Sequence, residues 1–179
     1  MEKQIGPTSP LDLIVMKQAA KAREFAAKAH DGQIYGPDQP YTYHLDAVAA
    51  LAGGTEAVQT VAYLHDVVED TDTTLQEVTA HFGTYVAECV AILSDEPGKN
   101  RKERKASSHK KLAEVQPYHY TALIVKAADR AANVRACVEK GNRGLLQMYR
   151  REQEAFRAAA YRPGLCDHLW DSIESDLVS

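Results

Sequence analysis

The 179-residue sequence contains no long uncharged apolar run, and its N-terminus lacks the basic region and apolar core of a secretory signal. The first absence argues against a transmembrane helix, and the second argues against export. We therefore expect a soluble, cytoplasmic protein that has no membrane partner. Hydrophobic residues make up 45% of the chain, which is enough for one domain with a full-sized core.

Cysteine is also scarce. Cys89, Cys137 and Cys166 stand singly in apolar or helical stretches, without the Cys-x-x-Cys spacing of a redox pair or a zinc knuckle. This arrangement favours buried free thiols in a reducing compartment. None of the three is a candidate site residue.

The chain has no excess of positive charge. Its formal net charge is -4, which argues against nonspecific nucleic-acid binding as the main role. Positive charge nevertheless gathers in residues 99–111, where Glu103 is the sole acidic residue. Such a run is usually a solvated helix face, but a local anion-binding site stays open.

Convincing strand patterns, repeats and domain linkers are absent as well. Nearly every segment has helical spacing, beginning with an apolar stripe from Leu11 to Ala29 that Ser9 would cap and Pro10 would start. We expect an all-α helical bundle that forms a single domain over residues 1–179, with helices in 145–178 packing on the part before them. The other expected elements are a loop over 32–40, a short helix that stops at 53, a central helix over 55–70, a helix with a capping box at 74–77, a loop over 94–100 and a helix over 120–140.

The stretch His65-Asp66-Val67-Val68-Glu69-Asp70 holds four groups that can bind a metal or move a proton within one and a half helical turns. At about 100° per residue these four side chains lie at roughly 0°, 100°, 40° and 140° around the axis. All four therefore share one side of the predicted helix, which indicates an active-site face.

Two other segments offer matching faces. His44 lies upstream, and downstream Lys126, Asp129, Arg130 and Asn133 span an arc of roughly 100° on an alanine-rich helix. We infer a metal-ligand set of His44, His65, Asp66 and Asp129. Two imidazoles and two carboxylates, without thiolate, suit Mn²⁺ or another divalent first-row ion better than a structural zinc.

These segments, in this order, resemble the HD superfamily of metal-dependent phosphohydrolases, and the fuller pattern resembles its alarmone hydrolase branch. The resemblance covers roughly residues 20–140. Its motifs are Ala29-His30-Asp31-Gly32-Gln33, Pro40-Tyr41 before His44, His65-Asp66-x-x-Glu69-Asp70-Thr71-Asp72-Thr73-Thr74 and Lys126-x-x-Asp129-Arg130-x-x-Asn133.

The resemblance implies that Glu69 and Asp70 orient or deprotonate the attacking water. The alternative is an outward-facing pair that caps the next turn. A cytoplasmic HD domain of this kind would act on a nucleotide as its small-molecule partner. The pattern does not address homo-oligomers, which stay open.

Five further residues are candidate substrate contacts. Lys126 and Arg130 would neutralise phosphate charge, and the resemblance favours Asn133 as a nucleotide contact. Arg101 and Lys102 fall where related hydrolases approach the distal phosphates of the substrate. For Arg130 a solvent-facing or Glu-paired role is the alternative.

The pattern departs from the family at the base pocket. A basic residue usually follows the Gly-Gln pair by two positions, but here that position is Tyr35. Tyrosine can stack on a base yet offers neither a cation nor a guanidinium fork. Leu45 after His44 and Arg130 after Asp129 also depart from the usual residues, though neither removes a ligand.

The prediction is a Mn²⁺-dependent phosphohydrolase that removes the 3′-pyrophosphate of guanosine tetra- or pentaphosphate, without a synthetase domain or regulatory tail. Two alternatives stay open. One is another nucleotide substrate, such as the 2′-phosphate of NADPH, an adenosine 3′-pyrophosphate or a nucleoside monophosphate. The other is an inactive nucleotide-binding regulatory module. His30 is interpreted as a helix C-terminal residue, and the remaining histidines, His81, His109, His119 and His168, have no partner spacing.

Overall fold

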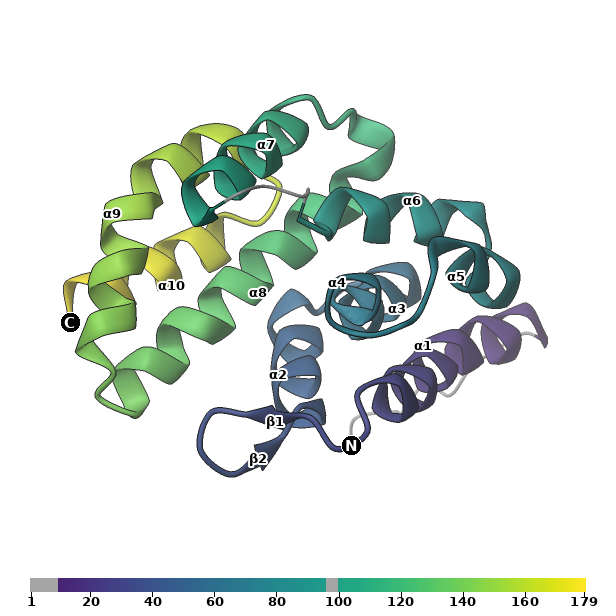
Figure 1. Cartoon of the computed structure of the whole chain (residues 1–179). Coiled ribbons are helices and arrows are strands. Elements are labelled where there is room, and N and C mark those ends of the chain that lie inside the picture. The colour runs from purple at the N-terminus through teal and green to yellow at the C-terminus, as the bar shows by residue number, and fades with distance from the viewer. Residues whose placement is uncertain (1–9, 96–99) are drawn as a thin grey trace, which may run out of the picture.

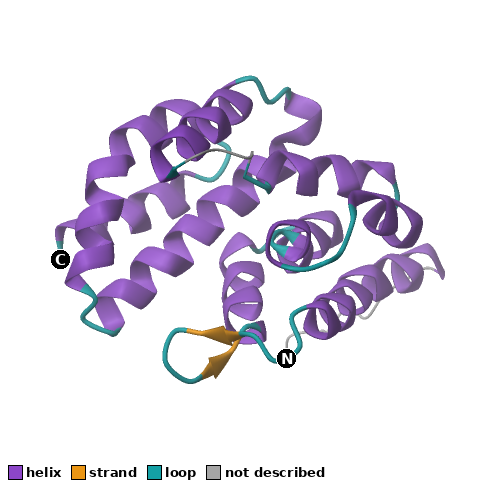
Figure 2. Ribbon diagram, viewed as in Figure 1, coloured by secondary structure: helices purple, strands orange, loops and turns teal. Residues whose placement is uncertain are grey.

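The computed structural model describes residues 10–95 and 100–179, and nearly all of this chain is helical (Figure 1 and Figure 2). The predicted all-α fold is confirmed. In chain order the elements are α1 Pro10–Ala29, β1 Ile34–Tyr35, β2 Gln39–Pro40, α2 Thr42–Ala52, α3 Glu56–Leu64, α4 Val67–Asp70, α5 Leu75–Phe82, α6 Thr84–Leu93, α7 Arg101–Ala113, the 3-10 turn η1 Pro117–His119, α8 Tyr120–Glu139, α9 Arg143–Ala160 and α10 Asp167–Val178.

Helix α8 is the centre of the bundle and matches the helix predicted over 120–140. It contacts α2, α3 and α6 as well as α9 and α10, and Figure 1 shows it crossing the middle of the molecule. Its buried side chains are mostly small, which allows neighbouring helices to approach its backbone closely. They include Ala122, Ala127, Ala128, Ala131 and Ala132.

The predicted central helix over 55–70 is interrupted. Helix α3 ends at Leu64 and α4 begins at Val67, with His65 and Asp66 in the turn between them. The His65 Nδ1 atom donates a hydrogen bond of 2.7 Å to the carbonyl of Ala62, which an unbroken helix would pair with the amide of Asp66. The side chain thus competes with the backbone ladder at the point where the helix breaks.

No strand was expected from the sequence, and this expectation is wrong for one short segment. Within the loop expected over 32–40, β1 and β2 form a short antiparallel hairpin in which Ile34 pairs with Pro40 and Tyr35 with Gln39. Gly36 has φ +71°, a conformation that favours glycine, and so permits the tight turn. The hairpin lies next to α2 and fixes the position of Tyr35.

The predicted starts of two other helices are confirmed. The capping box of Thr74 and Glu77 opens α5, and Thr55 accepts a hydrogen bond from the amide of Val58 at the start of α3. Ser9, the predicted cap of α1, lies outside the described residues, as do residues 96–99 of the predicted loop.

The last two helices pack on the body of the bundle through a buried aromatic and aliphatic cluster. Phe156 of α9 and Trp170 of α10 have ring centroids 5.2 Å apart, and both residues are almost fully buried with Ile173. All three cysteines are buried and free, as predicted. Each helix in the described part of the chain is too short or too polar to cross a membrane.

Candidate metal centre and active site

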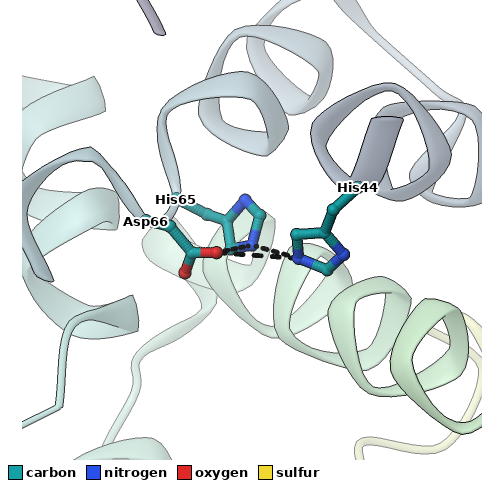
Figure 3. Close-up of side chains that lie close together, drawn as sticks. All are labelled: His44, His65 and Asp66. Carbon is teal, nitrogen blue, oxygen red and sulfur yellow. Dashed lines mark hydrogen bonds and ion pairs between the residues drawn. The ribbon is translucent and has the colours of Figure 1, made fainter. Parts of the chain in front are cut away.

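Three separate elements bring the four predicted metal ligands together. His44 comes from α2, His65 and Asp66 come from the turn between α3 and α4, and Asp129 comes from α8. His65 Nε2 lies 3.3 Å from His44 Nε2 and 2.9 Å from Asp66 Oδ2. Figure 3 shows the side chains of His44, His65 and Asp66 pointing toward one another.

Asp129 adds a second carboxylate near the two imidazoles. Its Oδ1 atom lies 3.4 Å from His44 Nε2 and 3.8 Å from His65 Nε2. Asn133 Nδ2, one turn further along α8, donates a 2.6 Å hydrogen bond to the same oxygen. This contact holds the carboxylate toward the imidazoles, as an outer partner of a metal ligand does.

The hydrogen bond from His65 Nδ1 to Ala62 also fixes the tautomer of the ring. Because Nδ1 carries the proton, the lone pair of a neutral His65 is on Nε2, which faces the cluster. The His44 Nε2 atom faces the same point, and its Nδ1 is buried without a hydrogen-bond partner among the described residues. Two imidazole nitrogens and two carboxylates thus converge, a donor set that fits a divalent first-row cation.

The two largely buried carboxylates of this cluster need positive charge nearby to stay ionised. Burial opposes ionisation of Asp66, but His65 and His44 hold its pKa well below its usual range. Burial likewise opposes ionisation of Asp129, yet the hydrogen bond from His44 and the charge of Lys126 lower its pKa to about 2. Burial disfavours a charged His44, but its hydrogen bonds to Asp129 and Asp66 raise its pKa to about 9. Without a cation, protons on the imidazoles balance the carboxylates.

Glu69 of α4 lines the cavity, and Asp70 of the same helix is linked to it through the hydroxyl of Tyr41. Burial raises the pKa of Glu69, although its carboxylate accepts a 2.9 Å hydrogen bond from the backbone amide of Asp95. Burial and the negative charge of Asp66 raise the pKa of Asp70. Carboxyl groups with raised pKa values beside a donor cluster are candidates for accepting and returning a proton.

Cationic side chains line the same cavity as the metal cluster. Lys126 is the nearest, with Nζ 3.8 Å from Asp129 Oδ2 and 3.2 Å from the carbonyl of Leu93. Arg101 lines the cavity from α7 while its guanidinium makes two hydrogen bonds, of 2.8 and 3.1 Å, to Glu152 of α9. Lys102 is exposed on α7 and does not line this cavity.

Arg130 is not solvent-facing. Only 7% of the residue is exposed, and its guanidinium carbon lies 4.6 Å from the centroid of the Tyr149 ring and 4.4 Å from that of Phe156. Arg130 Nη2 is 3.7 Å from Glu152 Oε2, whereas Nη1 is buried without a partner among the described residues. Arg130 therefore lines the cavity with a guanidinium that aromatic rings hold in place.

Tyr35 reaches the site from the hairpin. Its hydroxyl donates a 2.9 Å hydrogen bond to Asn133 Oδ1, and its ring stacks on His44 at a centroid distance of 4.8 Å. The Nζ atom of Lys140, the residue after α8, lies 5.0 Å from the centroid of the same ring. Tyr35 and Asn133, both predicted as substrate contacts, are thus joined to each other and border the metal cluster.

Reasoning from the sequence missed the role of Tyr41. Its hydroxyl lies 2.7 Å from Asp66 Oδ2 and 3.1 Å from Asp70 Oδ2, and its ring stacks on His30 at 4.4 Å. The Pro40-Tyr41 pair was noted as a motif, but no role followed from it. His30 lies at the C-terminal end of α1, as interpreted, and its ring also supports Tyr41.

Comparison with known proteins identifies the family. Residues 22–165 match the family model described as HD domain. The chain is 38% identical over 125 residues to a human guanosine-3′,5′-bis(diphosphate) 3′-pyrophosphohydrolase, an alignment that covers 66% of this chain and 68% of the human protein. It is 36% identical over 117 residues to a protein of the same description from Vibrio cholerae, covering 62% of this chain but only 16% of that protein.

Solved structures share the fold. One, of a metazoan ortholog of SpoT described as hydrolysing ppGpp, superposes with a TM-score of 0.69 at 22% identity, covering 88% of this chain and 94% of that one. Another, of lmo0812 from Listeria monocytogenes, gives a TM-score of 0.61 at 22% identity, covering 76% and 99%. The matching family model, the aligned relatives and the convergent His and Asp side chains together establish that this chain is an HD domain protein related to the (p)ppGpp hydrolases.

Proposed function

We propose that this protein is a Mn²⁺-dependent phosphohydrolase that removes the 3′-pyrophosphate of guanosine tetra- or pentaphosphate. The observation that carries the proposal is the meeting of a two-imidazole, two-carboxylate cluster with a lysine- and arginine-lined cavity. Such a cavity suits a polyanionic substrate whose reacting phosphorus lies at the carboxylate end. A single domain over residues 1–179 is part of the same proposal.

His44, His65, Asp66 and Asp129 would hold the metal ion. When bound there, a divalent cation lowers the pKa of a coordinated water and polarises a phosphoryl oxygen. The chain contributes the geometry, because the contact of His65 with Ala62 and that of Asn133 with Asp129 orient two of the four ligands.

Glu69 and Asp70 would manage the proton of the attacking water. Both follow the ligand pair by one turn, and the pKa of each carboxyl is raised. A carboxylate with a raised pKa is a better proton acceptor at neutral pH than an ordinary one. Tyr41 supports this arrangement because its hydroxyl fixes the Asp70 carboxylate relative to Asp66.

The remaining polar side chains would bind the substrate. Lys126 lies close enough to Asp129 to neutralise a phosphate at the metal. Arg130 has a donor, Nη1, that no group of residues 10–95 or 100–179 pairs with and that could donate to a phosphate oxygen. Arg101 would meet the distal phosphates, whereas Lys102 lies outside the cavity and has no contact in this proposal. Tyr35 and Asn133 would contact the nucleoside.

The choice of guanosine 3′-pyrophosphate rests on the relatives. The human and Vibrio cholerae proteins carry that activity in their descriptions, and the human alignment covers two thirds of both chains. The departure at Tyr35 keeps other nucleotides open, including NADPH, adenosine 3′-pyrophosphates and nucleoside monophosphates. An inactive regulatory module is the remaining alternative.

A turnover assay tests the proposal. Purified protein is incubated with guanosine tetraphosphate, its adenosine counterpart, NADPH and nucleoside monophosphates, each with Mn²⁺, Mg²⁺, Co²⁺ or Zn²⁺. We expect Mn²⁺-dependent formation of guanosine 5′-diphosphate and pyrophosphate. Faster turnover of another nucleotide would refute the substrate, and metal binding without any turnover would favour the regulatory module.

A further inference from the structure

Helix α7 presents one continuous face to the cavity. The lining residues Arg101, Lys105, Ser108, His109 and Leu112 recur at steps of three and four, the spacing of one helical face. Helix α7 contacts α9 and α6 (Figure 1), and its lining residues share the cavity with Asp129 of α8. This face is therefore the wall that the far end of a bound substrate would meet.

His109 is the imidazole of this wall, and the proposed function assigns it no role. It is partly buried, and its ring centroid lies 6.2 Å from that of Phe156. Neither ring nitrogen makes a hydrogen bond to a side chain or backbone group of residues 10–95 or 100–179. A partly buried imidazole that faces a cavity without a partner has a donor and an acceptor available to a ligand.

Charged groups face His109 from every element around it. Arg130 of α8 and Lys105 of α7 are positive, whereas Glu152 of α9 and Asp95 after α6 are negative. Burial acts first, and the two cations act next, to hold the pKa of His109 below its ordinary value of 6.5. The carboxylates oppose this shift without outweighing it.

Both carboxylates are already engaged by other side chains. Glu152 accepts two hydrogen bonds from Arg101, and Asp95 accepts one of 2.7 Å from Lys105 and one of 2.5 Å from Ser108. In the protein alone, burial and the two cations thus disfavour the charged form of His109. A bound anion would reverse this preference and favour the charged form of His109.

We infer that His109 is a substrate-binding residue and that it takes up one proton from solvent when a phosphate-bearing ligand enters the cavity. The inference rests on the proposed function for the identity of the ligand. No covalent bond changes: neutral imidazole and a solvent proton become imidazolium, which then donates a charge-assisted hydrogen bond to a phosphate oxygen. Arg130 and Lys105 share the phosphate charge and cease to repel the proton.

This exchange makes ligand affinity depend on pH with a fixed sign. The pKa of His109 is low in the free protein and higher in the complex. The extra affinity is therefore fully present below the pKa of the free protein and is lost as the pH rises through the pKa of the complex. The phosphate itself titrates nearby, so the informative quantity is the difference between the wild type and a variant without the imidazole.

Nuclear magnetic resonance tests the proton uptake directly. Protein loaded with diamagnetic Mg²⁺ is titrated with pH, alone and with inorganic pyrophosphate or guanosine 5′-diphosphate, and the His109 ring signal is identified by its loss in His109→Gln. We expect either ligand to raise the pKa of this ring by one unit or more. Binding of both ligands without any shift would overturn the inference.

Kinetics supply an independent measurement. For His109→Gln we expect KM to rise about 5- to 10-fold at pH 6.5, with kcat within twofold, and the difference to shrink toward pH 8.5. His168→Gln, an exposed residue of α10 outside the cavity, is the matched control. Hydrolysis of the nucleotide with an unchanged KM profile in His109→Gln refutes the role of His109 but keeps the proposed function. If pyrophosphate shifts the pKa of His109 but the protein hydrolyses no nucleotide, the role of His109 stands and the proposed function is refuted.

Discussion

The hydroxyl of Tyr41 lies 2.7 Å from Asp66 Oδ2 and 3.1 Å from Asp70 Oδ2, and so joins a proposed metal ligand to a proposed catalytic carboxylate. The ring is itself held by stacking on His30, whose Nδ1 lies 2.9 Å from Gln33 Oε1. Gln33 Nε2 in turn donates a 2.7 Å hydrogen bond to the carbonyl of Asp70. A closed chain of contacts therefore fixes both carboxylates.

Removing this hydroxyl should weaken metal binding without unfolding the protein. Outer partners of metal ligands typically contribute about 10- to 100-fold to affinity. We expect Tyr41→Phe to lower Mn²⁺ affinity in that range, as measured by calorimetry, while the circular dichroism spectrum is unchanged. Tyr43→Phe, an exposed tyrosine two residues further along in α2, is the control and should bind like the wild type. Equal affinity in Tyr41→Phe would leave the contact without a functional role.

Deleting a ligand should have a larger effect than deleting its support. Asp66→Ala and His65→Ala each remove one donor from the cluster, and we expect both variants to lose stoichiometric metal and activity while remaining helical. Metal content by elemental analysis, together with circular dichroism, checks this. Retention of one metal ion per chain in either variant would show that the ligand assignment is wrong.

Substitution of the two carboxylates proposed to handle the water should lower turnover without affecting metal binding. Glu69→Gln keeps a carbonyl oxygen that can accept the hydrogen bond from Asp95, so the local structure should survive. We expect Glu69→Gln and Asp70→Asn to bind metal normally but to lose about 10²-fold or more in kcat. Asp72→Asn, a nearby exposed carboxylate, is the control. Near wild-type rates in both variants would assign these residues a structural role.

The metal-free protein should lose stability as the pH rises above neutrality. The pKa of His44 is raised from 6.5 to about 9, because hydrogen bonds to Asp129 and Asp66 overcome the cost of its burial. A raised pKa in the folded state stabilises the fold fully below pH 6.5, and this stabilisation is lost as the pH rises through about 9.

We therefore expect the Tm of EDTA-treated protein to fall between pH 6.5 and 9, and His44→Gln to reduce that fall. Bound Mn²⁺ should also flatten the curve, because the cation replaces the protons on the imidazoles. Thermal unfolding followed by circular dichroism at several pH values checks both expectations. A metal-free Tm that is constant over this window would contradict the charge balance described for the cluster.

The last prediction concerns the nucleobase. Tyr35 presents an aromatic ring and no guanidinium fork, and its hydroxyl is engaged by Asn133. A ring that stacks on a base without reading its edge discriminates weakly, since every base has a π-face. We expect Tyr35→Ala to raise KM for guanosine and adenosine 3′-pyrophosphates by a similar factor, with kcat little changed. A strong guanine preference of the wild type, or an unchanged KM in the variant, would exclude this role.

The sequence by itself determined the helical class, most helix boundaries and the segments that carry the candidate site. Helical periodicity and caps are local properties, so the capping box at Thr74 and the long helix from Tyr120 could be read directly from the chain. The same periodicity put Lys126, Asp129 and Asn133 on one face. The donor types of the side chains then grouped that face with His44 and His65, and the resemblance to HD hydrolases supports the same set.

Only the tertiary structure decided how these faces meet. The break at His65 depends on a side chain that takes a backbone carbonyl, and the burial of Arg130 depends on two rings of α9. Tyr41 and His109 reach the site because α2 and α7 dock against other helices. Periodicity fixes which residues of one helix share a face, but the packing of distant segments fixes which faces enclose a cavity, and no local pattern contains that information.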